Sequence, residues 1–273
     1  MAARAYRAAR AQWHAVKGWP LVRHWRNGAL RRMAPLDGGR QRGTPVVRLY
    51  WEAFLERHRG DIRGVALEVG DSLTLRRLGG RAVTRADVID VAAREGVTVV
   101  ADLSKADHLP GESYDCFVAP FTAHHIYDLE SALFHALRIL KPGGVLLINF
   151  PCVDYYPPNG IDMGTGRPLH VFWWFTPLQV ENLLRRAGLD AADFEIAVDG
   201  NLFTRIAYQL NMTAEELAHD ERTYRDEGHP LLISVRARRP RDWQAARPPS
   251  RDAWLPSGDA QRWNSITGHY PLP

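Results

Sequence analysis

The sequence has few of the features that mark secreted, membrane or metal-binding proteins. Only two cysteines, Cys116 and Cys152, occur among 273 residues, which is too few for a disulfide framework or a cysteine-based zinc site. No apolar run reaches the roughly 18 residues that a transmembrane helix needs, and the first residues lack the apolar core of a secretory signal. We therefore expect a cytoplasmic protein with buried, reduced thiols and no metal site.

Basic charge is also missing from the middle of the chain. Residues 1–48 carry 11 basic residues and one acidic residue, and residues 236–273 carry seven arginines and three aspartates. The segment 49–235 holds 17 basic and 27 acidic residues. Because contacts to phosphate supply most nucleic-acid affinity, this acidic centre argues against a nucleic-acid partner.

The basic N-terminal region, residues 1–43, is predicted to be a helical arm followed by a linker. Within residues 4–33 apolar side chains recur at helical spacing, and arginines occupy the other faces. A basic helix with tryptophans can lie on an anionic membrane or bind a partner protein, so residues 1–33 are a candidate contact with a membrane or a partner. The alternative is a solvated arm that folds on its own domain. At the other end, residues 238–273 show no period and predict an irregular tail.

The segment 44–237 reads as one α/β domain. Thr44 and Pro45 predict a helix start, with Thr44 as cap and Pro45 as the first helical residue. Further helices are expected over 129–140, stopped by the Lys141-Pro-Gly-Gly run, and from the Thr176 cap to Gly188. Continuous apolar runs between helices are typical of a parallel sheet covered on both faces. They predict a Rossmann-like, mostly parallel, seven-stranded sheet, with strands at 65–69, 82–86, 97–101, 115–119, 145–150, 193–198 and 231–237.

Acidic residues stand where the first three strands are expected to end. Glu68 and Gly70 close the first strand, Asp87 the second and Asp102 the third. An acid after the second strand, roughly 20 residues from the first turn, suits the hydroxyls of a ribose. The turn lacks G-x-G-x-x-G and carries Asp71, which would repel a pyrophosphate. The pattern therefore argues against NAD and FAD and favours a ligand with a ribose but no phosphate, such as S-adenosylmethionine.

Several motifs resemble those of class I S-adenosylmethionine-dependent methyltransferases. They are ALEVGD at 66–71, VVADLSKADHLPGESYD at 99–115, AHHIYD at 123–128 and RILKPGGVLLINF at 138–150. A closer likeness, to a bacterial group often encoded near glycosyltransferases, is carried by RGTPVVRLYWEAFL at 42–55, WWFTP at 173–177 and GNLFTRIAYQLNMTAEEL at 200–217. The resemblance covers residues 42–236.

The resemblance implies S-adenosylmethionine as cofactor and gives each motif residue a role. Glu68 and Gly70 would lie in the cofactor turn, Asp87 at the ribose, Asp102 and Leu103 beside the adenine, and Pro120 and Phe121 near the methionine moiety. The chain departs from the pattern E-x-G-x-G-x-G, because Ser72 and Thr74 replace the later glycines.

Methyl transfer to a hydroxyl benefits from a general base. His124, in the His124-His125 pair after the fourth strand, is the first candidate, and we expect it to accept a proton near neutral pH. His170 is the second candidate. The alternative for each is a structural role, as a packing or capping histidine. The aromatic residues 172–175 are either part of the core or one wall of an acceptor pocket.

The resemblance and these residues predict an S-adenosylmethionine-dependent methyltransferase. Its expected reaction is O-methylation of a sugar or a glycosylated small molecule, a class of acceptor that only the resemblance implies. The alternative is a catalytically weak protein of the same fold that binds a glycosyltransferase or a membrane through its basic arm.

Overall fold

The computed structural model describes residues 34–36, 42–154 and 170–249. Most of the predicted basic arm (1–43), the segment 155–169 and the tail beyond residue 249 lie outside these residues. Within them, the helices are α4 (Val46–Arg57), α5 (Leu129–Ile139), α6 (Pro177–Arg186), α7 (Leu202–Gln209) and α8 (His219–Thr223). The strands are β1 (Gly64–Val69), β2 (Val83–Asp90), β3 (Val99–Val100), β4 (Tyr114–Ala119), β5 (Leu140–Pro151), β6 (Phe194–Asp199) and β7 (Leu232–Arg238).

The seven strands form one sheet in the order β3-β2-β1-β4-β5-β7-β6. The pairs among β1 to β5 are parallel, and β7 runs antiparallel between β5 and β6. Five of the strands therefore end at the same edge of the sheet. The predicted mostly parallel, seven-stranded sheet is confirmed.

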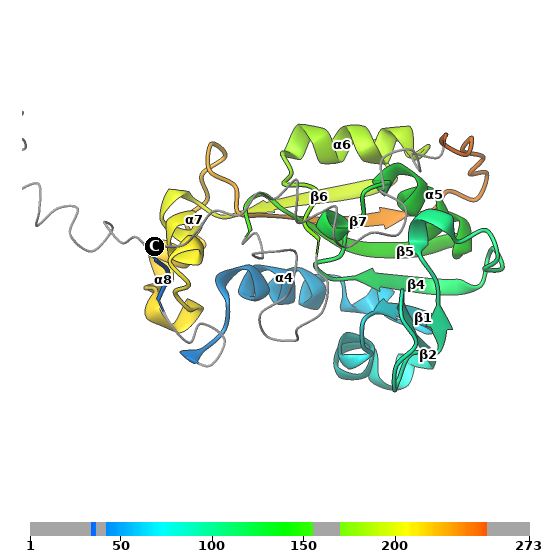
Figure 1. The fold of residues 1–273 in the computed structure, drawn as a ribbon, viewed down its shortest axis with the longest axis horizontal. Coiled ribbons are helices and arrows are strands. Elements are labelled where there is room, and N and C mark those ends of the chain that lie inside the picture. Colours follow the sequence, from blue (N-terminus) through cyan, green and yellow to red (C-terminus); the bar gives the residue numbers. More distant parts are fainter. Residues whose placement is uncertain (1–33, 37–41, 155–169, 250–273) are drawn as a thin grey trace, which may run out of the picture.

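Each face of the sheet carries its own apolar core. The neighbours Ala66 and Leu67 of β1 belong to different cores, because successive side chains of a strand point to opposite faces. Helices α5 and α6 cover the face of Leu67, and α4 covers the face of Ala66 (Figure 1). Burial on both faces explains why β1, β4 and β5 read as continuous apolar runs in the sequence.

Short turns connect the first strands. A five-residue π-helix, Leu75–Gly79, and a 3-10 helix, Gly80–Ala82, connect β1 to β2. A single 3-10 turn, Leu103–Lys105, lies between β3 and β4. On the described residues, the side of the sheet near β2 and β3 is therefore thinly covered.

Two predicted helix ends are wrong. Helix α4 begins at Val46 with Pro45 as its N-cap residue, because Pro45 pairs with Thr213 in an isolated bridge. Helix α5 ends at Ile139 and β5 begins at once, so Gly143 is not a helix cap. A side chain on Gly144 would lie 2.9 Å from the Lys141 carbonyl oxygen and 3.1 Å from that of Tyr114, so the run instead lets β5 pass close to β4.

Two segments at the margins of the domain are held by specific contacts. Leu36 donates its backbone N–H to the Leu210 carbonyl at 2.9 Å, so the described part of the linker lies against the end of α7. Residues 239–249 form no helix or strand, as predicted for the tail, but Trp243 Nε1 donates to the Ala187 carbonyl at 2.9 Å. The described start of the tail is therefore packed on the domain.

Candidate functional site

The turn after β1 is built around Glu68 and Gly70. Gly70 has a φ of +86°, a conformation that L side chains rarely adopt. The Glu68 carboxylate is buried and accepts the backbone N–H groups of Thr74 and Leu75 at 3.3 and 3.1 Å. Burial raises the pKa of Glu68 to about 7, against the hydrogen bonds from Thr74 and Leu75 that lower it. Glu68 thus holds the turn in place through its buried carboxylate.

The prediction that the second strand ends at Asp87 is wrong. Strand β2 continues to Asp90, and Asp87 is paired with Leu67 in the middle of the sheet. There Asp87 lies 3.0 Å from Arg85 Nε, and burial and the Asp87 carboxylate raise the pKa of Tyr114 to about 12. Sequence reasoning placed the end three residues early because β2 is exposed over much of its length and lacks a continuous apolar run.

Asp90 is the acid that lies level with the turn. The Gly70 N–H donates to the Ile89 carbonyl at 3.0 Å, so Gly70 lies beside the end of β2. Asp90 stands 20 positions after Gly70 in the sequence, the spacing expected of a ribose acid. That spacing was the signal that could have identified Asp90.

Arg94 bridges Asp90 and Gly70. Its Nε and Nη2 atoms lie 2.9 and 2.6 Å from Asp90 Oδ2, and Nη2 also donates to the Gly70 carbonyl oxygen. Asp90 Oδ1 accepts the Ala92 N–H at 3.1 Å, which closes the turn toward Arg94. Any ligand hydroxyl that binds the Asp90 carboxylate must therefore compete with a guanidinium.

Asp102 and Leu103 follow β3, as predicted. Asp102 is exposed, and its Oδ1 accepts both the N–H and the hydroxyl of Ser104, at 2.9 and 2.8 Å. Leu103 is buried in the core beneath. The Oδ2 atom of Asp102 has no hydrogen-bond partner among the described residues, so it can accept from a ligand.

Pro120 and Phe121 lie at the end of β4. Phe121 has a φ of +47°, and its N–H donates to Asn149 Oδ1 at 2.8 Å. The ring of Phe121 faces a cation already, because the guanidinium carbon of Arg48 lies 5.4 Å from its centroid. The buried Asn149 Nδ2 has no hydrogen-bond partner among the described residues. Asn149 and Arg48 lie within the motifs at 138–150 and 42–55, but sequence reasoning did not single them out, because both are remote from Phe121 in the sequence.

His124 lies in the 3-10 turn after β4, in contact with a carboxylate from the end of β5. Its Nε2 lies 3.5 Å from Asp154 Oδ2, and Tyr208 of α7 donates its hydroxyl to Asp154 Oδ1 at 2.6 Å. The imidazole is 2% exposed, and its Nδ1 has no partner in the part of the chain that the structure describes.

Burial determines the protonation state of His124. Burial first, and the neighbouring His125 second, lower the pKa of His124 to about 3. This pKa lies well below the ordinary value for histidine, because removal from water disfavours the charged imidazolium. His124 is neutral at neutral pH and is a weak base.

The structure does not bring His170 together with His124. The His170 side chain is exposed, and its backbone carbonyl oxygen lies 2.7 Å from His125 Nδ1. The segment from His170 to Phe175 instead lies along the turn after β4, because the Phe172 N–H donates to the His124 carbonyl at 2.8 Å. His170 is therefore next to the site through its backbone.

Neither a metal site nor a membrane-spanning helix occurs among the described residues. No group of three or more His, Cys, Asp or Glu side chains among them is arranged to hold a metal ion. None of the described helices combines the length and the apolar character needed to cross a membrane.

Comparisons with known proteins show what the central part of the chain is similar to. Residues 70–148, from the turn after β1 into β5, match a family model described as a methyltransferase domain. This match spans less than a third of the chain. A search of curated proteins gives no match.

Solved structures with a similar fold are distant. An S-adenosylmethionine-dependent methyltransferase from Mesorhizobium loti is 19% identical, with a TM-score of 0.46, over 71% of this chain and 98% of that chain. Phosphoethanolamine N-methyltransferase 2 from Haemonchus contortus, solved with S-adenosyl-L-methionine, is 16% identical with a TM-score of 0.47, over 72% of this chain and 54% of that chain.

The residues at the edge of the sheet fit this cofactor. Space is open above Gly70, where an added Cβ would meet only Arg94 Nη2 at 3.7 Å. Two carboxylates, Asp90 and Asp102, follow β2 and β3, and carboxylates accept from ribose hydroxyls and from an amino group. The negative charge of these two carboxylates suits a ligand with a cationic sulfur and no phosphate.

Proposed function

We propose that the chain is an O-methyltransferase whose acceptor is a sugar or a glycosylated small molecule. The observation that carries the proposal is the environment of His124. A neutral imidazole at the end of β4 has a carboxylate beside Nε2 and no partner on Nδ1 among the described residues. That arrangement suits a base that takes the proton of a hydroxyl.

The donor would be held at the carboxyl ends of β1, β2 and β3. Asp90 would accept from the ribose hydroxyls, in place of the sequence candidate Asp87, and Asp102 from the adenine amino group. The backbone of the turn after Gly70 would lie against the donor. When bound, S-adenosylmethionine supplies a methyl group on a positively charged sulfur.

The protein's own part in the reaction is to receive and stabilise a proton. With the Nε2 proton directed at Asp154, the lone pair of the buried His124 Nδ1 would take the proton once a bound acceptor hydroxyl reaches it. As the hydroxyl oxygen becomes a nucleophile, its proton moves to Nδ1, and the Asp154 carboxylate stabilises the resulting imidazolium. Tyr208 holds Asp154 through its hydroxyl, so Asp154 and Tyr208 are positioning residues.

The choice of acceptor rests on the closer resemblance of residues 173–177 and 200–217 to the group encoded near glycosyltransferases. Tyr208 of the proposed site lies within the second of these motifs. The aromatic segment 172–175 lies beside His124, where it can contact an acceptor.

The test is a product assay on the full chain. The protein is incubated with S-adenosylmethionine and a panel of methyl glycosides, and mass spectrometry records the addition of one methyl group and the demethylated donor. We expect methylation of a hydroxyl in at least one glycoside, and slower turnover in Asp154→Asn and Tyr208→Phe, with Tyr208→Phe the milder. Methylation of amines or phenols alone, with both variants unaffected, would contradict the proposal.

A further inference from the structure

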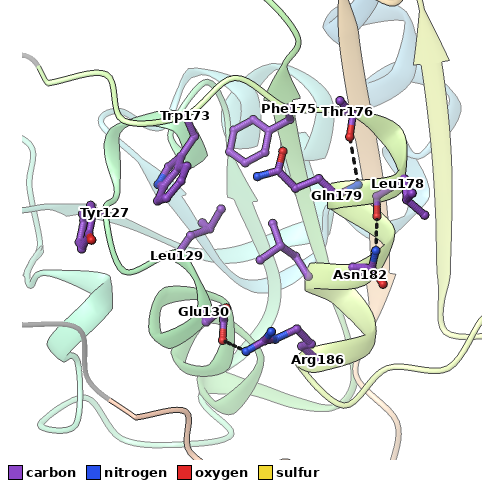
Figure 2. A pocket seen from close by; sticks show the side chains of 11 residues that line it. Tyr127, Leu129, Glu130, Trp173, Phe175, Thr176, Leu178, Gln179, Asn182 and Arg186 are labelled. Atoms are coloured by element: carbon purple, nitrogen blue, oxygen red, sulfur yellow. Dashed lines mark hydrogen bonds and ion pairs between the residues drawn. The ribbon is translucent and has the colours of Figure 1, made fainter.

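A cavity of about 440 Å³ lies between helices α5 and α6, apart from the carboxyl ends of β1 to β3. Figure 2 shows its lining, with aromatic side chains at one end and side chains of α6 at the other. Its volume is within the range of roughly 300–1,000 Å³ that small-molecule sites span. Neither the donor residues nor His124 line it.

The aromatic end of the cavity is rigid. Trp173 donates its Nε1–H to the Ile126 carbonyl at 2.9 Å, which fixes the orientation of the indole. The Tyr127 ring stacks on Trp173, with centroids 5.9 Å apart and planes at 22°. Phe175 is buried against Phe150 at 5.0 Å, edge to face. An apolar ring face can bind here without reordering these side chains.

The opposite end offers uncharged hydrogen-bonding groups. The Gln179 side chain extends into the cavity toward Phe175 (Figure 2), and its amide makes no hydrogen bond with another described residue. Asn182 uses Nδ2 to donate to the Leu178 carbonyl at 3.0 Å, which leaves its Oδ1 as an acceptor. The charges at the floor are paired, because Arg186 lies 2.8 Å from Glu130. The cavity thus combines aromatic faces with neutral amide groups and no unpaired lining charge.

We propose that this cavity binds one neutral sugar ring of the acceptor. A pyranose has an apolar C–H face that packs on an aromatic ring, and an edge of hydroxyls that both donate to and accept from amides. A purely apolar ligand would leave the Gln179 amide buried without a partner, which is unfavourable. A charged ligand finds no free countercharge there.

The cavity is connected to the proposed catalytic residue by the chain itself. Trp173 directly follows Phe172, whose N–H donates to the His124 carbonyl, and Tyr127 lies three residues beyond His124. A sugar ring held here would therefore place a neighbouring part of the acceptor toward the turn after β4. The role as an acceptor subsite rests on the proposed function, whereas sugar binding itself does not.

The test is a direct binding measurement on the full chain without the methyl donor. Methyl glycosides of glucose, galactose and mannose are titrated one at a time, with saturation-transfer NMR and calorimetry as readouts. Because a single sugar ring makes few contacts, we expect a Kd on the order of 1 mM for at least one of them. Trp173→Ala and Gln179→Ala should each weaken binding about tenfold or abolish it.

Matched variants separate the cavity from the rest of the surface. Trp174→Ala removes a neighbouring tryptophan that is 51% exposed and outside the cavity, and Gln209→Ala removes a glutamine at the end of α7. Both should bind the glycoside as the wild type does. Circular dichroism checks that Trp173→Ala folds, and Gln179→Ala on its own keeps the test valid if it does not.

The outcomes distinguish the subsite from the proposed function. Absence of saturable binding by every glycoside, or equal binding by all four variants, would overturn the subsite. Binding of phenol with no response to any glycoside would assign the cavity to an aromatic ligand and also overturn it. If glycosides are methylated but the Gln179→Ala variant keeps the wild-type KM, the function stands and the subsite fails. If glycosides bind the cavity but are never methylated, the subsite stands and the function fails.

Discussion

The two halves of the candidate site are built in opposite ways. On the donor side, which comprises Gly70, Asp90, Arg94 and Asp102, the polar groups are at or near the surface, and local turns hold them. On the acceptor side, which comprises His124, Asp154 and Tyr208, the groups are largely buried and come from three elements. The donor side can therefore tolerate loss of a single contact with the fold intact, whereas the chemistry of the acceptor side depends on burial.

The largest effect is expected from His124 on the acceptor side. His124→Ala should lower turnover about 10²-fold, the lower end of the range for a general base, because burial makes His124 a weak base. Donor affinity, measured by calorimetry, should stay within a few-fold of wild type. His170→Ala is the control and should keep most of its turnover. A His124→Ala variant with unchanged turnover would remove this residue from the mechanism.

Asp90 and Asp87 form the sharpest test of the donor side. Asp90→Ala should weaken S-adenosylmethionine binding by about 1.5–3 kcal/mol, because hydrogen bonds to a charged group are lost. Asp87→Ala should leave affinity within a few-fold, since Asp87 lies in the middle of β2. Calorimetric titration of both variants decides between them. The reverse order of affinities would return the ribose role to Asp87.

Glu68 is the exception on the donor side, because it is a buried carboxylate. Its pKa is about 7 in the folded chain against an ordinary value of 4.5. The folded state therefore binds the proton more tightly, and the stability that this contributes is present below pH 4.5 and lost as the pH rises through about 7. At about 1.4 kcal/mol per pKa unit, the loss is on the order of 3–4 kcal/mol.

Urea unfolding of wild type and Glu68→Gln at acidic and alkaline pH measures this pH-dependent loss of stability. The difference in unfolding free energy between the two proteins should move in favour of Glu68→Gln as the pH rises from about 5 to about 8. A difference that does not change with pH would mean that Glu68 is ionised throughout, with its carboxylate fully satisfied by the turn.

The smallest expected effect belongs to Arg94. Because its guanidinium occupies Asp90 and the Gly70 carbonyl, Arg94→Gln should release the carboxylate and tighten donor binding by roughly 2- to 10-fold, the range for a partly exposed ion pair. The gain should shrink at high salt, where the pair in the wild type is screened. Arg85→Gln, whose ion pair is with Asp87, is the control. Weaker donor binding in Arg94→Gln would show that Arg94 itself contacts the donor.

The sequence by itself determined the sheet and two of the four donor-side residues, Gly70 and Asp102. Continuous apolar runs predicted the buried strands, because a strand buried on both faces has apolar residues at nearly every position. Gly70 and Asp102 were found because each lies directly beside the strand that places it. The prediction that β2 ends at Asp87 was wrong because β2 is largely exposed, so no apolar pattern marks its end. Only the register of β2 against β1 in the structure shows where the strand ends.

Tertiary structure decided which residues form the acceptor side and what pKa His124 has there. Asp154 and Tyr208 are separated by 54 positions, and no local period links either of them to His124. The sequence gives the ordinary pKa of a histidine, whereas the folded chain removes His124 from water and lowers that pKa to about 3. The contacts of Arg94 with Gly70 and of Arg48 with Phe121, and the cavity between α5 and α6, likewise form only when segments remote in the sequence meet. Burial and long-range contact depend on the whole packed chain, and a sequence read segment by segment contains neither.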